Sequence, residues 1–174
     1  MAELRSGALD VAVVTSESTR GDGGTLALWS ERVLLALPEG HPLTEREAIC
    51  WTDLLGETVL LTQCNQELRL EDLLISKFGV SEDRPGISED RPGIERHEVS
   101  RSIIKSLVGV VASVSLVLES DSGAKFSGLI YREIRDSIGP SRIGYLAHWR
   151  GDNDNPALAS FLNLLRERYP SPAA

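Results

Sequence analysis

The chain has 174 residues, of which 41% are hydrophobic and 25% are charged, as in ordinary soluble globular proteins with one sizeable core or two small lobes. Its 26 acidic and 18 basic residues give a net charge of −8. Because a surface of this charge repels phosphates and anionic lipids, we expect this chain alone to bind neither nucleic acid nor membranes.

The N-terminal residues and the two cysteines indicate the cellular compartment of the chain. The first ten residues lack the apolar run that a signal peptide or a membrane-spanning helix requires, which favours the cytoplasm. Cys50 and Cys64 have no CxxC spacing. They therefore fit free thiols in a reducing compartment better than a disulfide.

Apolar and β-branched runs predict three strands in the first part of the chain, at residues 9–14, 32–37 and 58–62. The first is expected to be covered on both faces in a parallel or mixed sheet. Between the second and the third, Thr52 is the predicted cap of a short helical turn.

An amphipathic helix is predicted next, because four apolar residues follow the i, i+3, i+4, i+8 spacing of one helical face and Gly79 ends it. These residues are Leu70, Leu73, Leu74 and Phe78.

The second part of the chain alternates between strands and helices. Strands are predicted at residues 95–100, 114–118, 129–134 and 143–149, with a Gly139-Pro140 turn between the last two. A helix capped by Ser100 or Ser102 carries Ile104, Leu107, Val108 and Val111 on one face. The final helix begins with Asn155 as cap and Pro156 in its first position, and Leu158, Phe161, Leu162 and Leu165 form its apolar face. This alternation indicates an α/β fold.

Residues 81–94 consist of the heptapeptide SEDRPGI written twice. Each copy contains Pro-Gly, a strong turn signal, and lies between a predicted helix and a predicted strand. Doubling a loop adds only about half a kilocalorie per mole of closure entropy, and each copy adds negative charge rather than a basic site. The repeat is therefore interpreted as an inert duplication in a surface loop.

Five segments, which span nearly the whole chain, resemble the effector-binding domain of LysR-type transcriptional regulators and occur in that family's order. They are LRSGALDVAVV at 4–14, LWSERVLLALPEGHPL at 28–43, WTDLLGETVLL at 51–61, SLVGVVASVSLVLES at 106–120 and HWRGDNDNPALASFLNLL at 148–165. The GHPL turn after an apolar strand is fairly specific, and the combination of the five segments is more specific than any single piece.

The resemblance implies a periplasmic-binding-protein-like α/β fold, with two lobes joined by crossing strands and an effector held between them. Residues 1–37 and 121–174 would form the first lobe, and residues 38–120 the second. The segment near 119–126 would be the return crossing.

Two departures from the family's pattern stand out. The family's helix-turn-helix and the opening elements of its first lobe have no counterpart here, so the first lobe is expected to be incomplete. The family's Gly-x-Gly step is replaced by Val111-Ala112-Ser113, whose side chains are expected to narrow that part of the cleft.

Catalytic and metal-binding patterns are absent from the sequence, since His41, His97 and His148 are scattered and no HExxH or GxSxG motif occurs. We therefore expect no enzyme, cofactor or metal. A hydrolase using Cys64 with His97 is a remote alternative.

Five polar residues are the predicted ligand contacts, because hydroxyls and amides at strand ends can orient a small molecule in a cleft. They are Thr15, Ser16, Thr62, Gln63 and Ser113. For each, a helix cap or turn hydroxyl is the competing interpretation. Trp149 and Asn155 are expected to serve packing and capping of the last helix.

The predicted function is that of a non-catalytic sensor domain for a small-molecule effector, with carboxylates among the candidates. Its other expected partners are a second copy or a complete regulator. A stand-alone solute-binding protein of the same fold and a non-functional fragment are the alternatives.

Overall fold

The structure, a computed structural model, forms two compact units, and each is described by itself. It describes residues 2–16, 23–63, 70–79, 91–123 and 126–170. Unit 1 comprises residues 1–30 together with 143–174, and unit 2 comprises residues 31–142.

These units do not follow the predicted lobe boundaries, because residues 31–37 and 121–142 belong with unit 2. Strand pairing explains the difference. β7 (Leu129–Asp136) pairs antiparallel with residues 34–38 of β2 (Gly24–Pro38) and parallel with β3 (Ala48–Cys50). β7 is therefore held within unit 2, and the division into lobes at residues 37–38 and 120–121 stays a prediction.

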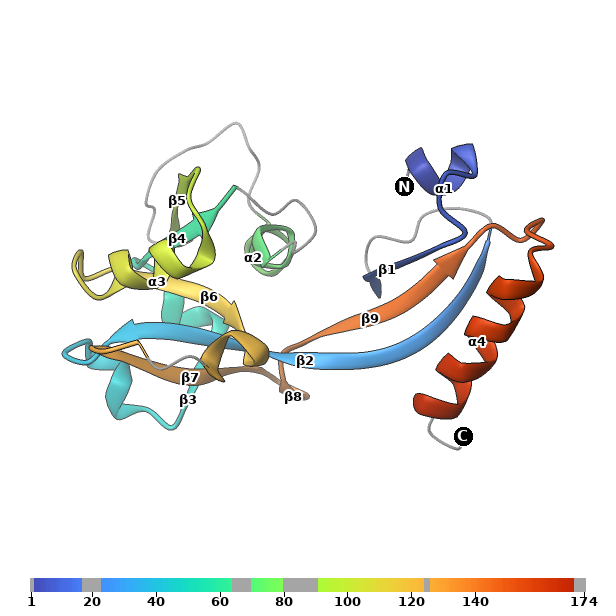
Figure 1. The fold of residues 1–174 in the computed structure, drawn as a ribbon. Helices are drawn as coiled ribbons and strands as arrows, with labels where there is room; N and C mark the ends of the chain where they lie inside the picture. The colour runs from blue at the N-terminus through green and yellow to red at the C-terminus, as the bar shows by residue number, and fades with distance from the viewer. Residues whose placement is uncertain (1, 17–22, 64–69, 80–90, 124–125, 171–174) are drawn as a thin grey trace. The chain divides into compact units, whose positions relative to one another are not determined.

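Unit 1 contains a small sheet covered by a helix. Its elements are α1 (Ala2–Ser6), β1 (Val11–Thr15), the first part of β2, β9 (Arg142–Trp149) and α4 (Pro156–Arg168). β9 lies between β1 and β2 in strand order. α4 lies beside the strands of this unit (Figure 1). Its Leu158 and Leu162 pack against Ala147 of β9, which gives this unit its core.

Two expectations for unit 1 need correction. β1 occupies the predicted strand, but it runs antiparallel to β9, and Val13 is 50% exposed. The exposed Val13 shows that one face of β1 is open to solvent. In the described part of the chain β1 is also the last strand in its sheet order. Phe161 is also exposed rather than part of the buried face of α4. The predicted Asn155 cap is confirmed, since its side chain accepts a hydrogen bond from the Ala157 backbone N–H.

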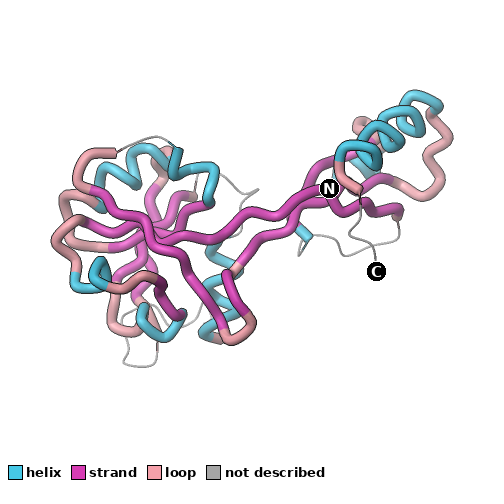
Figure 2. Tube along the Cα trace, turned by 90° about the horizontal axis from the view of Figure 1, so that it is seen from below, coloured by secondary structure: helices cyan, strands magenta, loops and turns pink. Residues whose placement is uncertain are grey.

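Unit 2 contains a larger mixed sheet in which β2, β6, β4 and β5 lie side by side in that order. Figure 2 shows helical segments on either side of its strands. Besides β2, β3 and β7, its elements are η2 (Pro42–Glu45), η3 (Trp51–Leu54), β4 (Thr58–Thr62), α2 (Leu70–Phe78), β5 (Gly93–His97), α3 (Arg101–Val108), β6 (Val114–Leu118), η4 (Glu119–Gly123) and β8 (Gly139–Pro140).

Parallel pairing organises the centre of this sheet. β4 is parallel to both β5 and β6, and parallel neighbours need crossover connections, which α2 and α3 supply. Ile104 and Val108 of α3 pack on Leu60 of β4. Residues 33–37 of β2 are all buried, which confirms the predicted apolar strand, although β2 begins at Gly24.

Local signals account for several boundaries in unit 2. β4 and β6 match the predicted ranges, and α2 ends where Gly79 adopts a φ of +61°. The predicted helical turn exists as η3, but Thr52 does not cap it. The carboxylate of Asp53 instead accepts a 2.8 Å hydrogen bond from the backbone N–H of Cys50.

The heptapeptide repeat is only partly described, since residues 80–90 lie outside the described residues. The end of the second copy is not in a loop. Gly93 and Ile94 are the first residues of β5, and the Gly93 backbone N–H donates a 2.8 Å hydrogen bond to the carbonyl of Glu57. The second copy therefore contributes to the sheet, and β5 begins two residues earlier than predicted.

Candidate functional site

The parallel strands of unit 2 end at a common edge, called the carboxyl edge below. It is formed by the last residue of β4 and by the residues that follow β4, β5 and β6, namely 62–63, 98–101 and 119–121. In α/β sheets, ligands bind outside the carboxyl ends of parallel strands. This edge is therefore where a ligand site is expected in unit 2.

Thr62 and Gln63 lie at this edge, as the sequence predicts. The Thr62 hydroxyl donates a hydrogen bond to the carbonyl of Val99, and the Gln63 backbone N–H donates one of 2.9 Å to the carbonyl of His97. Thr62 is half-buried and Gln63 is exposed. The two bonds hold the end of β4 against the segment that leads into α3.

The first turn of α3 presents a positive end at the carboxyl edge. Ser100 is its cap residue, yet its side chain makes no capping hydrogen bond. The first turn contains no acidic residue and begins with Arg101. Because the first N–H groups of a helix lack intrahelical acceptors and carry the positive end of its dipole, this terminus suits an anion.

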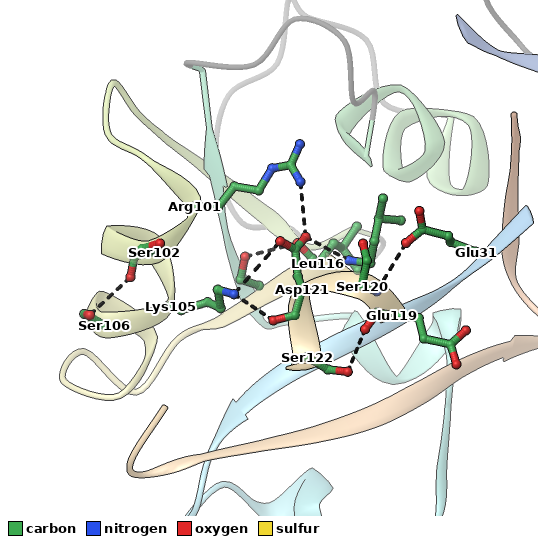
Figure 3. A network of polar contacts seen from close by, with 12 residues as sticks. Glu31, Arg101, Ser102, Lys105, Ser106, Leu116, Glu119, Ser120, Asp121 and Ser122 are labelled. Carbon is green, nitrogen blue, oxygen red and sulfur yellow. Dashed lines mark hydrogen bonds and ion pairs between the residues drawn. The ribbon is translucent and has the colours of Figure 1, made fainter. Parts of the chain in front are cut away.

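A carboxylate of the same chain faces these cations. Asp121 Oδ2 lies 3.3 Å from Arg101 Nη1, and its other carboxylate oxygen lies 4.0 Å from Lys105 Nζ (Figure 3). Lys105 donates a 2.8 Å hydrogen bond to the Asp121 carbonyl, and its ammonium is 4.7 Å from the centre of the Phe126 ring. The Lys105 side chain is only 5% exposed, so these contacts compensate its burial.

A second ionic group lies beside the first. Arg32 on β2 binds Glu119, directly after β6, at 2.5 Å and Glu133 on β7 at 2.9 Å. The hydrogen bond from Arg32 holds the pKa of Glu119 below its ordinary value, and the two carboxylates raise the pKa of Arg32. Arg32 therefore links β2 to β7 and to the residue that follows β6.

Ser113 lies at the opposite edge of the sheet from Thr62. In the β4–β6 register Leu60 is opposite Ser115, so Thr62 lies level with Val117. Ser113 is four residues before Val117, or about 13 Å along the strand. Its buried hydroxyl donates to the Val111 carbonyl at 3.3 Å. The structure does not bring Ser113 together with Thr62 and Gln63, because a residue that precedes a parallel strand lies at its amino edge.

The step that replaces the family's Gly-x-Gly pattern lies at that amino edge too. Ala112 has a φ of +48° and is the single non-glycine residue with a positive φ in the described ranges. Val111 is 50% exposed. The side chains expected to narrow the cleft are thus not at the carboxyl edge.

Thr15 and Ser16 belong to unit 1. Thr15 ends β1, is buried, and lies opposite Tyr145 of β9. Ser16 is exposed, and a Cβ atom added at Gly144 would lie 3.2 Å from its hydroxyl oxygen. The five predicted contacts are therefore divided, with two in unit 1 and three in unit 2.

Sequence reasoning missed the charged members of the carboxyl edge. Arg101, Lys105 and Asp121 were not among the predicted contacts, although each has a local signal. Arg101 follows a predicted cap, Lys105 comes one helical turn later, and Asp121 follows a predicted strand. Charged residues directly after buried strands identify such an edge.

The remote hydrolase pair gains no geometric support. Cys64 lies outside the described residues, and His97 Nε2 is 3.2 Å from the Glu95 carboxylate. Within the described ranges, no group of three or more His, Cys, Asp or Glu side chains is placed to hold a metal ion. No helix in those ranges has the length and apolar character to span a membrane.

Curated relatives are transcriptional regulators. The chain is 24% identical over 174 residues to the Hca operon transcriptional activator HcaR of Escherichia coli, covering 99% of this chain and 55% of that protein. It is 32% identical over 78 residues to the uncharacterized HTH-type transcriptional regulator YybE of Bacillus subtilis, covering 44% of this chain and 27% of that protein. The chain thus spans about half the length, or less, of these relatives.

Solved structures show the same fold. Full-length BenM E226K mutant superposes with a TM-score of 0.74 at 20% identity, covering 99% of this chain and 56% of that chain. The reduced OxyR regulatory domain from Pseudomonas aeruginosa gives 0.68 at 21% identity, covering 95% and 76% of the two chains. The fold is therefore the periplasmic-binding-protein-like α/β fold of LysR effector-binding domains.

The family assignment covers almost the whole chain. The family described as LysR substrate binding domain matches residues 1–170. Its members are regulatory domains of transcription factors. The chain belongs to the LysR substrate binding domain family, the effector-binding sensor domains of LysR-type transcriptional regulators.

Proposed function

We propose that this sensor domain binds a small anionic effector, with a carboxylate as the recognised group, at the carboxyl edge of unit 2. The observation that carries this proposal is the first turn of α3, where Ser100 leaves the helix N-terminus without a side-chain cap and Arg101 adds a positive charge. Backbone N–H groups and a guanidinium together favour a carboxylate.

Other residues at this edge have complementary roles in the proposal. The Ser100 hydroxyl and the Gln63 side chain are exposed and polar, so they would orient the rest of the effector. Thr62, whose hydroxyl donates to the Val99 carbonyl, holds the end of β4 in place. Thr15 and Ser16 stay predicted contacts of unit 1, and Ser113 stays a predicted contact away from the carboxyl edge.

We further propose a regulatory setting without catalysis. Effector binding would shift the conformational equilibrium of a complete regulator on DNA, in the cytoplasm, through partners that are further copies of this domain or complete regulators. The family's regulatory role and the full-length regulator structures among its neighbours support this setting.

A thermal-shift screen tests the proposal. Aromatic acids, amino acids and other small carboxylates should include a compound that raises the unfolding midpoint, because a ligand specific for the folded state adds about 2.7 kcal/mol at one hundred times its Kd. Arg101→Gln should weaken that compound about tenfold or more, since a charged hydrogen bond is lost.

Arg46→Gln is the matched control, because Arg46 also forms an ion pair in unit 2, with Asp53 at 2.8 Å, away from the carboxyl edge. Equal affinity for wild-type and Arg101→Gln protein would exclude the carboxyl edge as the anion site. Loss of binding in Ser113→Ala with retention in Arg101→Gln would move the site to the amino edge.

A further inference from the structure

The 3-10 helix η4 (Glu119–Gly123), called the strap below, follows β6 directly at the carboxyl edge. None of its five residues is buried. The strap is therefore not held by packing of apolar side chains. A segment that lacks such packing needs little free energy to open locally.

Polar contacts hold the strap on the β2 side. Glu119 pairs with Arg32. The Ser120 backbone N–H donates a 3.2 Å hydrogen bond to the Glu31 carboxylate (Figure 3). The Ser122 hydroxyl donates to the Glu119 carbonyl at 2.7 Å, within the strap. The β2 side of the strap is thus tied by charge to a strand that contributes to both units.

Asp121 holds the strap on the α3 side. Its Oδ2 atom is 3.3 Å from Arg101 Nη1 and accepts a 3.4 Å hydrogen bond from the Leu118 backbone N–H. Strong charge-assisted hydrogen bonds are about 2.7–2.9 Å long. The Asp121 carboxylate therefore occupies the cationic end of α3 with long contacts that a free carboxylate could improve.

We propose that Asp121 is an internal competitor for the anion site, and that a bound external anion displaces its carboxylate from Arg101 and Lys105 and releases the strap. This inference rests on the proposed function, since it concerns the regulation of the same site. Exchange of one carboxylate for another conserves the charge pairing of Arg101, and the new anion also offers a partner to the buried Lys105 ammonium. The exchange exposes no buried strap side chain.

The test uses benzoate and inorganic sulfate as probes, titrated at constant ionic strength into the intact chain. If Asp121 competes, Asp121→Asn should bind the probe about fivefold more tightly, because the apparent affinity of the wild-type chain is reduced by the fraction in which the site is occupied. Asp154→Asn, an exposed acid in unit 1, is the control for loss of one negative charge and should match the wild type.

Hydrogen exchange on the wild-type chain gives a second readout that needs no variant. Amide exchange in residues 119–123 should rise when the probe binds. The probe could bind in a way that depends on Arg101, yet bind Asp121→Asn no more tightly than wild type and leave amide exchange unchanged. That result would refute competition by Asp121 and release of the strap, and it would leave the proposed site intact. Absence of binding to both folded proteins would refute the site and the strap together.

Discussion

The indole Nε1 of Trp51 donates a 2.8 Å hydrogen bond to the hydroxyl oxygen of Ser141, and both side chains are buried. The bond joins η3 to the residue that follows β8. The Trp51 ring also meets Phe78 of α2 edge-on, with 6.4 Å between centroids, and the Lys77 ammonium lies 5.7 Å from its centre. Trp51 is therefore the point where three segments of unit 2 are joined.

Ser141→Ala should destabilise the chain by about 1–3 kcal/mol, because it leaves a buried indole N–H without a partner. Urea unfolding followed by tryptophan fluorescence measures the change. Ser137→Ala, an exposed serine on the neighbouring turn, is the matched control and should stay within about 0.5 kcal/mol of wild type. Equal effects of the two changes would mean that the Trp51–Ser141 bond contributes nothing to stability.

Ala112→Gly should stabilise the chain by about 1 kcal/mol, because glycine adopts a positive φ without the steric cost that a Cβ atom imposes there. The midpoint of thermal unfolding should rise. Ala159→Gly in the exposed part of α4 should have the opposite sign, since glycine lowers helix propensity. A lower midpoint for Ala112→Gly would contradict the left-handed conformation.

Gly24→Ala should destabilise unit 1 by about 1–3 kcal/mol, because an added Cβ atom would overlap the Trp149 indole and force the ring to move. Gly40→Ala is the control, since open space surrounds its position. Near-ultraviolet circular dichroism and chemical unfolding report the change. If Gly24→Ala had the spectrum and stability of the wild type, the Trp149 indole would not pack directly against Gly24.

Stability should fall in acid through Asp10. Hydrogen bonds from Asn153 and Asn155 lower the pKa of the Asp10 carboxyl below its ordinary value. A group whose pKa is lower in the folded chain stabilises it above the unfolded pKa, and that contribution is lost as the pH falls through the folded value. The stability difference between wild type and Asp10→Asn should therefore be full at pH 6 and shrink as the pH falls below about 4, toward the lower pKa of the folded chain. A constant difference across this range would exclude the linkage.

Short-range signals predicted much of the fold. The apolar runs of β4 and β6 and the Asn155-Pro156 start of α4 are local patterns, and the structure places these elements there. β3 was missed, because three residues are too few for a periodic signal. The cap of η3 was assigned to Thr52, although Asp53 makes the bond, since both side chains are capable of it.

The candidate site could be predicted only in part. Thr62 and Gln63 lie at the end of β4, whereas Ser113 precedes β6. Because β4 and β6 are parallel, the end of one strand and the start of the other lie at opposite edges of the sheet. The partners of Arg32 are 87 and 101 residues away in the chain. No local pattern connects such residues, so the ionic groups around the strap emerged only from strand pairing.

The division of the chain has a consequence for the order of folding. Unit 2 is one continuous stretch, whereas unit 1 combines two stretches separated by all of unit 2. During synthesis, residues 31–142 can complete their sheet as they emerge, while β1 and the first half of β2 wait for β9 and α4. A released chain truncated at residue 142 should accordingly contain a protease-resistant unit 2 beside an unassembled N-terminal segment.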